Sequence, residues 1–189
     1  VHSVFLSMLA ISWFWFLGAA YLTQLPNFTQ KVLKSSESVV TLLLTMFSVG
    51  VGAGSLLCER LSGRKIELGL VPLGSIGLSV FGIDLFFAYT PPPVSQLMNL
   101  EQFLATSGSF RVLADLVLIG VFGGFYIVPL YAFIQVRTEA QYRSRIIAAN
   151  NIFNALFMVV SSIMGALMLG VAKLTTPQFF LTLALMNIA

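Results

Sequence analysis

The chain has 189 residues, of which 58% are hydrophobic and 9% are charged, and its formal net charge is +3. A soluble domain has roughly 25% charged residues, so this composition, with a mean hydropathy of +0.94, excludes a soluble globular protein. The only cysteine and the only histidine are Cys58 and His2, which excludes an internal disulfide and a His/Cys metal cluster.

Five apolar runs follow one another along the chain, and a shorter run ends it. Because a helix rises about 1.5 Å per residue, about 20 apolar residues cross the ~30 Å hydrocarbon core. We therefore predict an all-α integral membrane protein, with residues 1–189 forming one transmembrane domain. The predicted helices cover residues 4–25, 39–61, 67–89, 112–136 and 146–171, with a partial helix at 178–189.

Proline and glycine mark the predicted helix ends. Pro26 is expected to end the first helix, Gly63 to separate the second from the third, and the prolines at 91–93 to stop the third. Pro177 precedes the last run, which has about half the length needed to cross. Because the chain also begins at Val1 without a basic segment before its first span, we expect a fragment of a longer polypeptide.

Lysine and arginine are concentrated in the second and fourth gaps between the predicted helices. By the positive-inside rule these two gaps face the cytoplasm, which places the start of the fragment inside as well. The other gaps hold Lys31, Lys34, Arg111 and Lys173, against six basic residues in the two richer gaps: Arg60, Arg64, Lys65, Arg137, Arg143 and Arg145.

The longest gap, residues 90–111, contains Leu97, Leu100, Phe103 and Leu104 at nearly helical spacing. This spacing indicates either a short amphipathic helix on the outer membrane interface or an ordinary external loop with apolar anchors.

The fourth predicted helix combines close-packing and bending residues. Glycines four residues apart, Gly120 and Gly124 here and Gly50 and Gly54 in the second helix, allow helix backbones to approach each other. Two readings remain open: static close packing, or bending during a gating motion. The residues that would bend this helix are Gly120, Gly123, Gly124 and Pro129.

The fifth predicted helix carries amides that lipid tails cannot satisfy. Asn150 and Asn154 share one face, which continues to Ser161 and Gly165, and Asn151 lies beside them. These side chains either line a water-filled cavity or bond neighbouring helices.

Two acidic and two aromatic residues complete the candidates. Asp84 lies inside the third run and needs a partner, which a neighbouring helix is expected to supply. Asp115 is interpreted as a charge in the first turn of the fourth helix, where it suits the helix dipole. Trp13 and Trp15 lie on nearly opposite faces of the first helix, and the face of Trp13 also carries Gln24. We expect that face to line a substrate path, although apolar packing explains both tryptophans as well.

No enzyme signature is present in the sequence: it has no phosphate-binding glycine loop, no metal-ligand set and no serine–histidine–acid constellation. We therefore expect no catalytic residue, no metal and no cofactor in this segment.

The basic turn after the second helix resembles the signature loop of the major facilitator superfamily. That loop has an acid followed by a base, then a glycine and two basic residues, and lies on the cytoplasmic side of each six-helix half. Here the acid is Glu rather than Asp, and one extra residue precedes the glycine. The matching residues are Glu59, Arg60, Gly63, Arg64 and Lys65.

A closer resemblance extends over nearly the whole chain. Residues 12–16, 55–75, 120–130 and 145–151 are similar to the bacterial lysophospholipid transporter family, particularly the versions fused to an acyltransferase and an acyl-acyl-carrier-protein synthetase. The resemblance implies the C-terminal six-helix half of a twelve-helix transporter, whose last helix is cut short. Its partners would be the missing N-terminal half, the bilayer of the bacterial inner membrane and, in a fused chain, the acyltransferase.

The resemblance further implies that lysophospholipid moves inward for reacylation on the cytoplasmic side. In this superfamily the first, second, fourth and fifth helices of a half border the cavity, which favours the asparagine face and disfavours Asp84. Arg143 and Arg145 would attract a departing phosphate, or simply anchor the cytoplasmic side. Two alternatives stay open: a proton-coupled exporter of small hydrophobic compounds that uses Asp84, and a non-transporting membrane anchor for a fused acyltransferase.

Overall fold

The computed structural model describes residues 2–63, 65–88 and 96–188, and all regular elements within these ranges are helices. In chain order they are α1 (His2–Asn27), the π-helix η1 (Phe28–Val32), α2 (Glu37–Leu61), α3 (Leu70–Phe87), α4 (Leu100–Ala105), α5 (Ser109–Arg137), α6 (Arg143–Gly165), the π-helix η2 (Ala166–Val171) and α7 (Thr176–Met186).

Five helical segments in the described residues are long and apolar enough to cross a membrane. They are His2–Val32, Glu37–Leu61, Leu70–Phe87, Ser109–Arg137 and Arg143–Val171, whereas α7 has 11 residues. The prediction of an all-helical chain is confirmed for the described residues, and each predicted span corresponds to one of these segments, whose length and apolar composition are compatible with a membrane protein.

Several predicted helix ends differ from those of the structure by two or more residues, and two of these differences bear on the candidate residues. The first helix runs through Pro26, because Leu25 and Phe28 are buried on either side of it and the Thr29 hydroxyl donates a 2.8 Å bond to the Leu25 carbonyl. The π-helix η1 then carries the span to Val32. The fourth span begins at Ser109 rather than 112, which moves Asp115 out of the first turn and into the packed part of α5.

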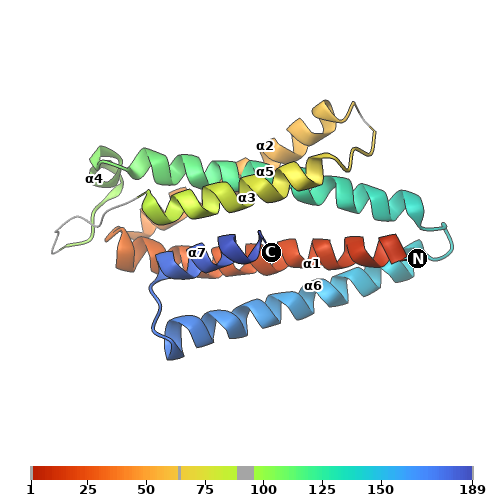
Figure 1. Ribbon diagram of the computed structural model, residues 1–189. Coiled ribbons are helices and arrows are strands. Elements are labelled where there is room, and N and C mark those ends of the chain that lie inside the picture. The colour runs from red at the N-terminus through yellow and green to blue at the C-terminus, as the bar shows by residue number, and fades with distance from the viewer. Residues whose placement is uncertain (1, 64, 89–95, 189) are drawn as a thin grey trace.

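The helices lie side by side in one bundle, with α6 along one edge and α1 between α6 and the group formed by α2, α3 and α5 (Figure 1). α5 packs along α2 and α3 and also contacts α1, which packs along α6. The short α7 covers α3, and its first turn is closed by a capping box between Thr175 and Gln178.

The predicted short helix in the long gap is present as α4, which begins with a capping box between Asn99 and Gln102. Phe103 is fully buried, whereas Leu97 is 56% exposed. Its placement on the outer interface stays a prediction, and the prolines at 91–93 lie outside the described residues.

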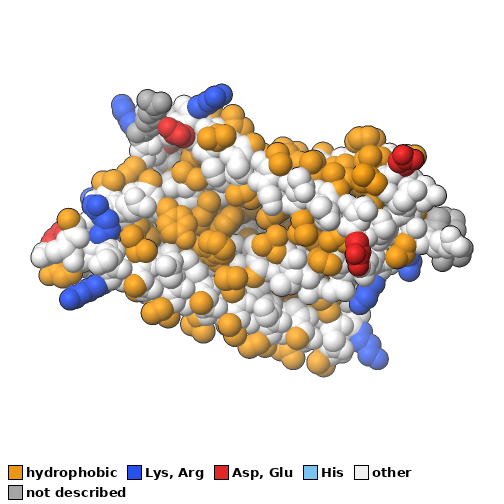
Figure 2. Space-filling model, turned by 180° about the vertical axis from the view of Figure 1, so that it is seen from behind, with side chains coloured by type: hydrophobic (Ala, Val, Ile, Leu, Met, Phe, Trp, Pro, Cys, Tyr) orange, Lys and Arg blue, Asp and Glu red, His pale blue; other side chains and the backbone are white. Residues whose placement is uncertain are grey.

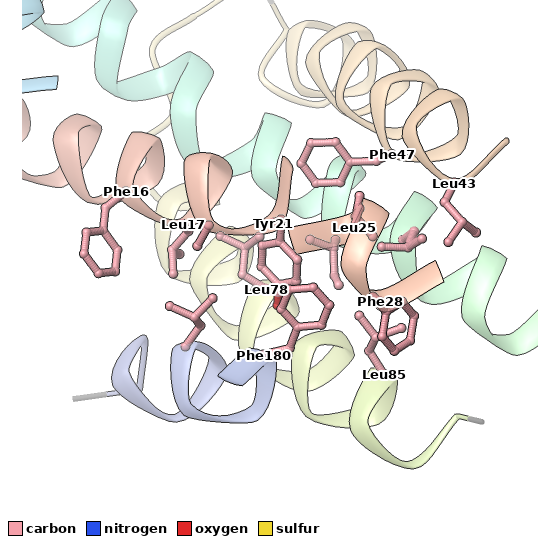
Figure 3. Close-up of a cluster of buried hydrophobic side chains, with 14 of the residues drawn as sticks. Phe16, Leu17, Tyr21, Leu25, Phe28, Leu43, Phe47, Leu78, Leu85 and Phe180 are labelled. Carbon is pink, nitrogen blue, oxygen red and sulfur yellow. The ribbon is translucent and has the colours of Figure 1, made fainter. Parts of the chain in front are cut away.

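The core includes buried side chains along α5, and one cluster of it lies where α1, η1, α2, α3 and α7 meet (Figure 3). Tyr21 of α1 stacks on Phe180 of α7 with ring centroids 4.8 Å apart, and Phe28 meets the same ring edge-on at 5.5 Å. Leu43 of α2 and Leu85 of α3 close the cluster from the other helices, and both are buried.

The outer surface is apolar along the length of the helices, and lysine and arginine gather toward the two ends (Figure 2). α6 is the most exposed of the long helices: Ile152 and Val171 on its span are 71% and 75% exposed. Such an apolar band suits contact with lipid tails or with another apolar helix.

Candidate functional site

The predicted asparagine face of α6 lies against α1. Asn154 and Ser161 are buried, and both bond across this contact. The side-chain amide of Asn154 lies 2.9 Å from the Ser12 hydroxyl, and the Ser161 hydroxyl donates a 2.8 Å bond to the carbonyl of Phe16. Of the two roles left open for this face, the structure therefore shows interhelical bonding at both positions.

Asn154 is the centre of a polar cluster that also reaches α5. Its Nδ2 lies 3.4 Å from the Tyr131 hydroxyl, to which Trp15 Nε1 donates a 3.1 Å bond. With the amide reversed, Asn154 bonds the side chain of Asn150 and accepts from Trp15 Nε1, both at 3.2 Å, and keeps its contact with Ser12. In both orientations the amide joins α6 to α1. Sequence reasoning missed Ser12 and Tyr131 here.

The remaining predicted residues of α6 lie elsewhere. Asn151 is exposed and off the Asn154 face, and Arg143 and Arg145 are exposed in the first turn. The structure brings none of these three into the polar cluster. Asn150 does lie next to Asn154, with its own Oδ1 buried and without a hydrogen-bond partner among the described residues.

Trp13 belongs to a second polar cluster, which the sequence did not reveal. Its indole N–H donates a 2.8 Å bond to Asn187 Oδ1, beyond the end of α7. Asn187 Nδ2 in turn donates to the Ser75 carbonyl and to the Ser79 hydroxyl, both at 2.9 Å. The only available signal was an amide in the last apolar run, where lipid cannot satisfy it.

Gln24 lies near the C-terminal end of α1, at the end of the bundle opposite the basic turn. It accepts a 2.9 Å bond from Asn27 Nδ2 and borders a cavity of about 300 Å³, which Lys31 and Thr175 also line. Gln24 is therefore separate from both polar clusters.

Two pairs of glycines form a close seam between α2 and α5, which we call the glycine seam: Gly50 and Gly54 on α2, Gly120 and Gly124 on α5. A Cβ atom on Gly54 would lie 2.2 Å from the carbonyl oxygen of Val121, and one on Gly124 would lie 2.6 Å from the Gly54 backbone. The close approach indicated by the four-residue spacing is present, whereas bending of α5 stays a prediction.

The other two predicted bending residues also pack inside the bundle. A Cβ atom on Gly123 would lie 3.0 Å from the Phe14 ring of α1. Pro129 is buried, and α5 continues through it to Arg137.

A charged cluster joins α3 and α5 near the end opposite the basic turn. Asp84 forms an ion pair with Arg111, whose Nε donates a 2.9 Å bond to Asp84 Oδ2. This confirms the expected partner on a neighbouring helix. Asp115, one turn after Arg111, is 2% exposed, and its Oδ2 has no hydrogen-bond partner among the described residues. Its interpretation as a first-turn charge is wrong, because α5 begins six residues before it.

The basic turn lies between α2 and α3. Gly63 has a φ of +56°, which favours glycine, and the Lys65 amide donates a 3.0 Å bond to the Ser62 carbonyl. A cavity of about 490 Å³ is lined by Leu56, Glu59, Arg60 and Gly63. Arg64, the fifth residue of the predicted signature, lies outside the described residues.

Comparison of the chain with protein-family models, with curated proteins and with solved structures finds no match.

Proposed function

We propose that the chain is the C-terminal six-helix half of a major facilitator transporter that carries lysophospholipid across the bacterial inner membrane. The observation that carries this proposal is the pattern of helix contacts. The helices can be paired as α1 with α5, α2 with α6 and α3 with α7. Under this pairing the α2–α5 contact corresponds to the α6–α1 contact, and the α3–α7 and α1–α5 contacts each correspond to themselves. The α3–α5 contact has a smaller counterpart between α7 and α1, consistent with the short α7.

This pairing is what inverted repeats produce. Each triplet has three helices, so successive crossings give the two triplets opposite orientations in the membrane, and α4 lies in the connection between them. Inverted repeats are typical of secondary transporters, which place their substrate near the interface between repeats. The α1–α6 contact with its Asn154 cluster is one such interface.

The substrate rests on chemistry and on the resemblance of the sequence. A lysolipid has a polar headgroup and one apolar chain, so its path needs a few polar side chains beside large apolar surfaces. The cluster of Asn154, Trp15 and Tyr131 offers amide, indole and phenol groups next to the exposed apolar face of α6. The orientation proposed here places the basic turn and the start of α6 in the cytoplasm.

The test is uptake of labelled lysophospholipid into spheroplasts by variants at neighbouring positions of α6. Asn154→Leu removes the central amide of the cluster and is expected to abolish most uptake. Asn151→Leu, the matched control on the exposed side, is expected to keep it. Uptake is normalised to the amount of monodisperse protein extracted from the membrane. If folded Asn154→Leu protein transports as well as Asn151→Leu protein, the cluster is structural and the proposed path is wrong.

A second candidate function, a proton-coupled exporter of small hydrophobic compounds, is favoured by the charged cluster. Two carboxyl groups, Asp84 and Asp115, face one guanidinium there, and the buried Asp115 supplies the deep carboxyl group that such an exporter needs. The discriminating measurement is transport driven by a pH jump in Asp115→Asn. An exporter loses its response to the jump, whereas a facilitative lipid carrier keeps its rate. Uptake by the membrane part without any fused acyltransferase would exclude the anchor alternative.

A further inference from the structure

A cavity of about 610 Å³ opens at the end of the bundle where α5 ends and α6 begins, and no predicted site residue in the described part of the chain lines it. This volume lies within the ~300–1,000 Å³ range of small-molecule sites. We call it the Arg137 cavity; its wall consists of Val4, Phe5 and Met8 from α1, Arg137 from α5, Thr138, Glu139 and Tyr142 from the connection, and Ile146 from α6.

The two sides of the Arg137 cavity differ in chemistry. The α1 and α6 side is apolar: Val4 and Met8 are buried, and Phe5 packs edge-on against Phe153 of α6 at 6.1 Å. The side formed by the connection carries a guanidinium, a carboxylate, a phenol and a hydroxyl. A ligand that fits both sides has a polar, charged head and an apolar tail.

The charged groups of this cavity have opposite signs and stand two residues apart in sequence. The Arg137 side chain is exposed and lies over the Phe133 ring, with its guanidinium carbon 5.5 Å from the ring centroid. Glu139 accepts a 2.9 Å bond from Gln141 Nε2, which leaves its other carboxylate oxygen outside that bond. A guanidinium recognises phosphate, and a carboxylate recognises an ammonium group that can donate hydrogen bonds.

The position of the cavity suits a membrane lipid. The described spans end at Arg137 and begin again at Arg143, so the connection lies at the level of the headgroups. The first two turns of α1 continue the apolar wall along the span, where an acyl chain would lie. The exposed Arg143 and Arg145 at the same end add positive charge near the cavity but do not line it.

We propose that the Arg137 cavity binds the headgroup of a zwitterionic phospholipid with a primary amine, with Arg137 on the phosphate, Glu139 on the ammonium and the acyl chain against α1. Binding of this headgroup does not require transport: the same chemistry serves a resident diacyl lipid and a single-chain substrate that pauses at this end.

The test is lipid binding to the purified protein in detergent, followed by native mass spectrometry. The probes are phosphatidylethanolamine, phosphatidylcholine and phosphatidylglycerol with identical chains. The wild type is expected to prefer the ethanolamine lipid roughly tenfold, because of the three headgroups only ethanolamine combines a positive charge with N–H donors for Glu139. Arg137→Gln is expected to weaken binding of all three lipids roughly tenfold. Glu139→Gln is expected to abolish the preference and leave binding of phosphatidylglycerol intact.

Arg143→Gln is the matched control, because it removes one positive charge from the same end of the bundle without touching the cavity wall. If Arg137→Gln binds each of the three lipids as strongly as Arg143→Gln does, the assignment is wrong. It is also wrong if the wild type binds the three lipids without preference. Adding lyso-phosphatidylethanolamine and glycerophosphoethanolamine to the titration distinguishes a two-chain lipid, a one-chain lipid and the free headgroup. Binding of the free headgroup as strong as that of the lipids would refute the role of the apolar wall. Lipid binding does not require transport, so the absence of uptake in the transport assay would not contradict lipid binding at the Arg137 cavity.

Discussion

Replacing Gly54 by alanine is the most direct test of the packing between α2 and α5. The added methyl carbon would lie 2.2 Å from the Val121 carbonyl oxygen and 2.6 Å from its Cα, whereas ordinary contacts begin near 3.4 Å. The obstacle is the backbone of Val121 on α5, so no side chain can rotate away. The helices must separate locally by about 1 Å or more, which removes dispersion contacts along the glycine seam.

The expected loss follows from the size of this displacement. Overpacking a well-packed contact costs roughly 1–3 kcal/mol, and in a bilayer no hydrophobic effect between the helices compensates for lost packing. Against this, alanine raises helix propensity by up to about 1 kcal/mol. Gly52→Ala, on the same helix, measures that second effect alone, because a Cβ atom there has no neighbouring atom within 4 Å.

The assay is unfolding of the purified protein in mixed micelles by increasing mole fraction of sodium dodecyl sulfate, followed by tryptophan fluorescence. Gly54→Ala is expected to unfold about 2 kcal/mol more easily than Gly52→Ala. Equal unfolding curves for the two variants would refute the close contact at the glycine seam.

Three further predictions concern single side chains, and all are read from unfolding in the same detergent system. Asp115→Asn should stabilise the protein by about 1 kcal/mol, because it removes a carboxylate that is buried and faces the charge of Asp84. Asp84→Asn should destabilise the protein by breaking the pair with Arg111. Shifts of the two variants in the same direction would contradict the described geometry. Lys173→Gly should stabilise the end of η2 by about 1 kcal/mol, since Lys173 has a φ of +55°, and an unchanged midpoint would mean that this turn is not formed. Ser161→Ala should cost about 0.6 kcal/mol for its lost bond to the α1 backbone, typical of such bonds in membrane helices; no loss would argue that α6 packs on α1 without it.

The spans could be predicted from the sequence because hydropathy alone determines which segments can enter lipid. Their ends were less accessible. Pro26 reads as a helix stop, yet the burial of Leu25 and Phe28 holds the backbone helical beyond it. The start of α5 was not predicted, because Ser109 follows Gly108, which has a positive φ. Such a local backbone conformation leaves no periodic pattern of apolar residues in the sequence.

The candidate site was predicted unevenly for a similar reason. Asn154 was found because a polar side chain inside an apolar run must meet protein or water. Its partner Ser12 was not, because a serine in a helix ordinarily bonds its own backbone, as Ser12 also does to the Met8 carbonyl at 2.9 Å. Which two helices adjoin depends on the tertiary arrangement, so neither the Trp13–Asn187 bond nor the wall of the Arg137 cavity has a signature in the sequence.

The bonds that join α1 to the end of the chain impose an order on biosynthesis. The Ser12–Asn154 pair is separated by 142 residues and the Trp13–Asn187 pair by 174. At about 5–20 residues per second, the first pair cannot form until roughly 7–28 s after Ser12 has been translated. During that interval Ser12 has only its bond to the Met8 carbonyl, and the Trp13 indole has not yet met Asn187. Nascent α1 is thus expected to depend on the translocon or on a membrane chaperone until α6 arrives, and crosslinking of nascent chains stalled before and after residue 165 would reveal when that protection ends.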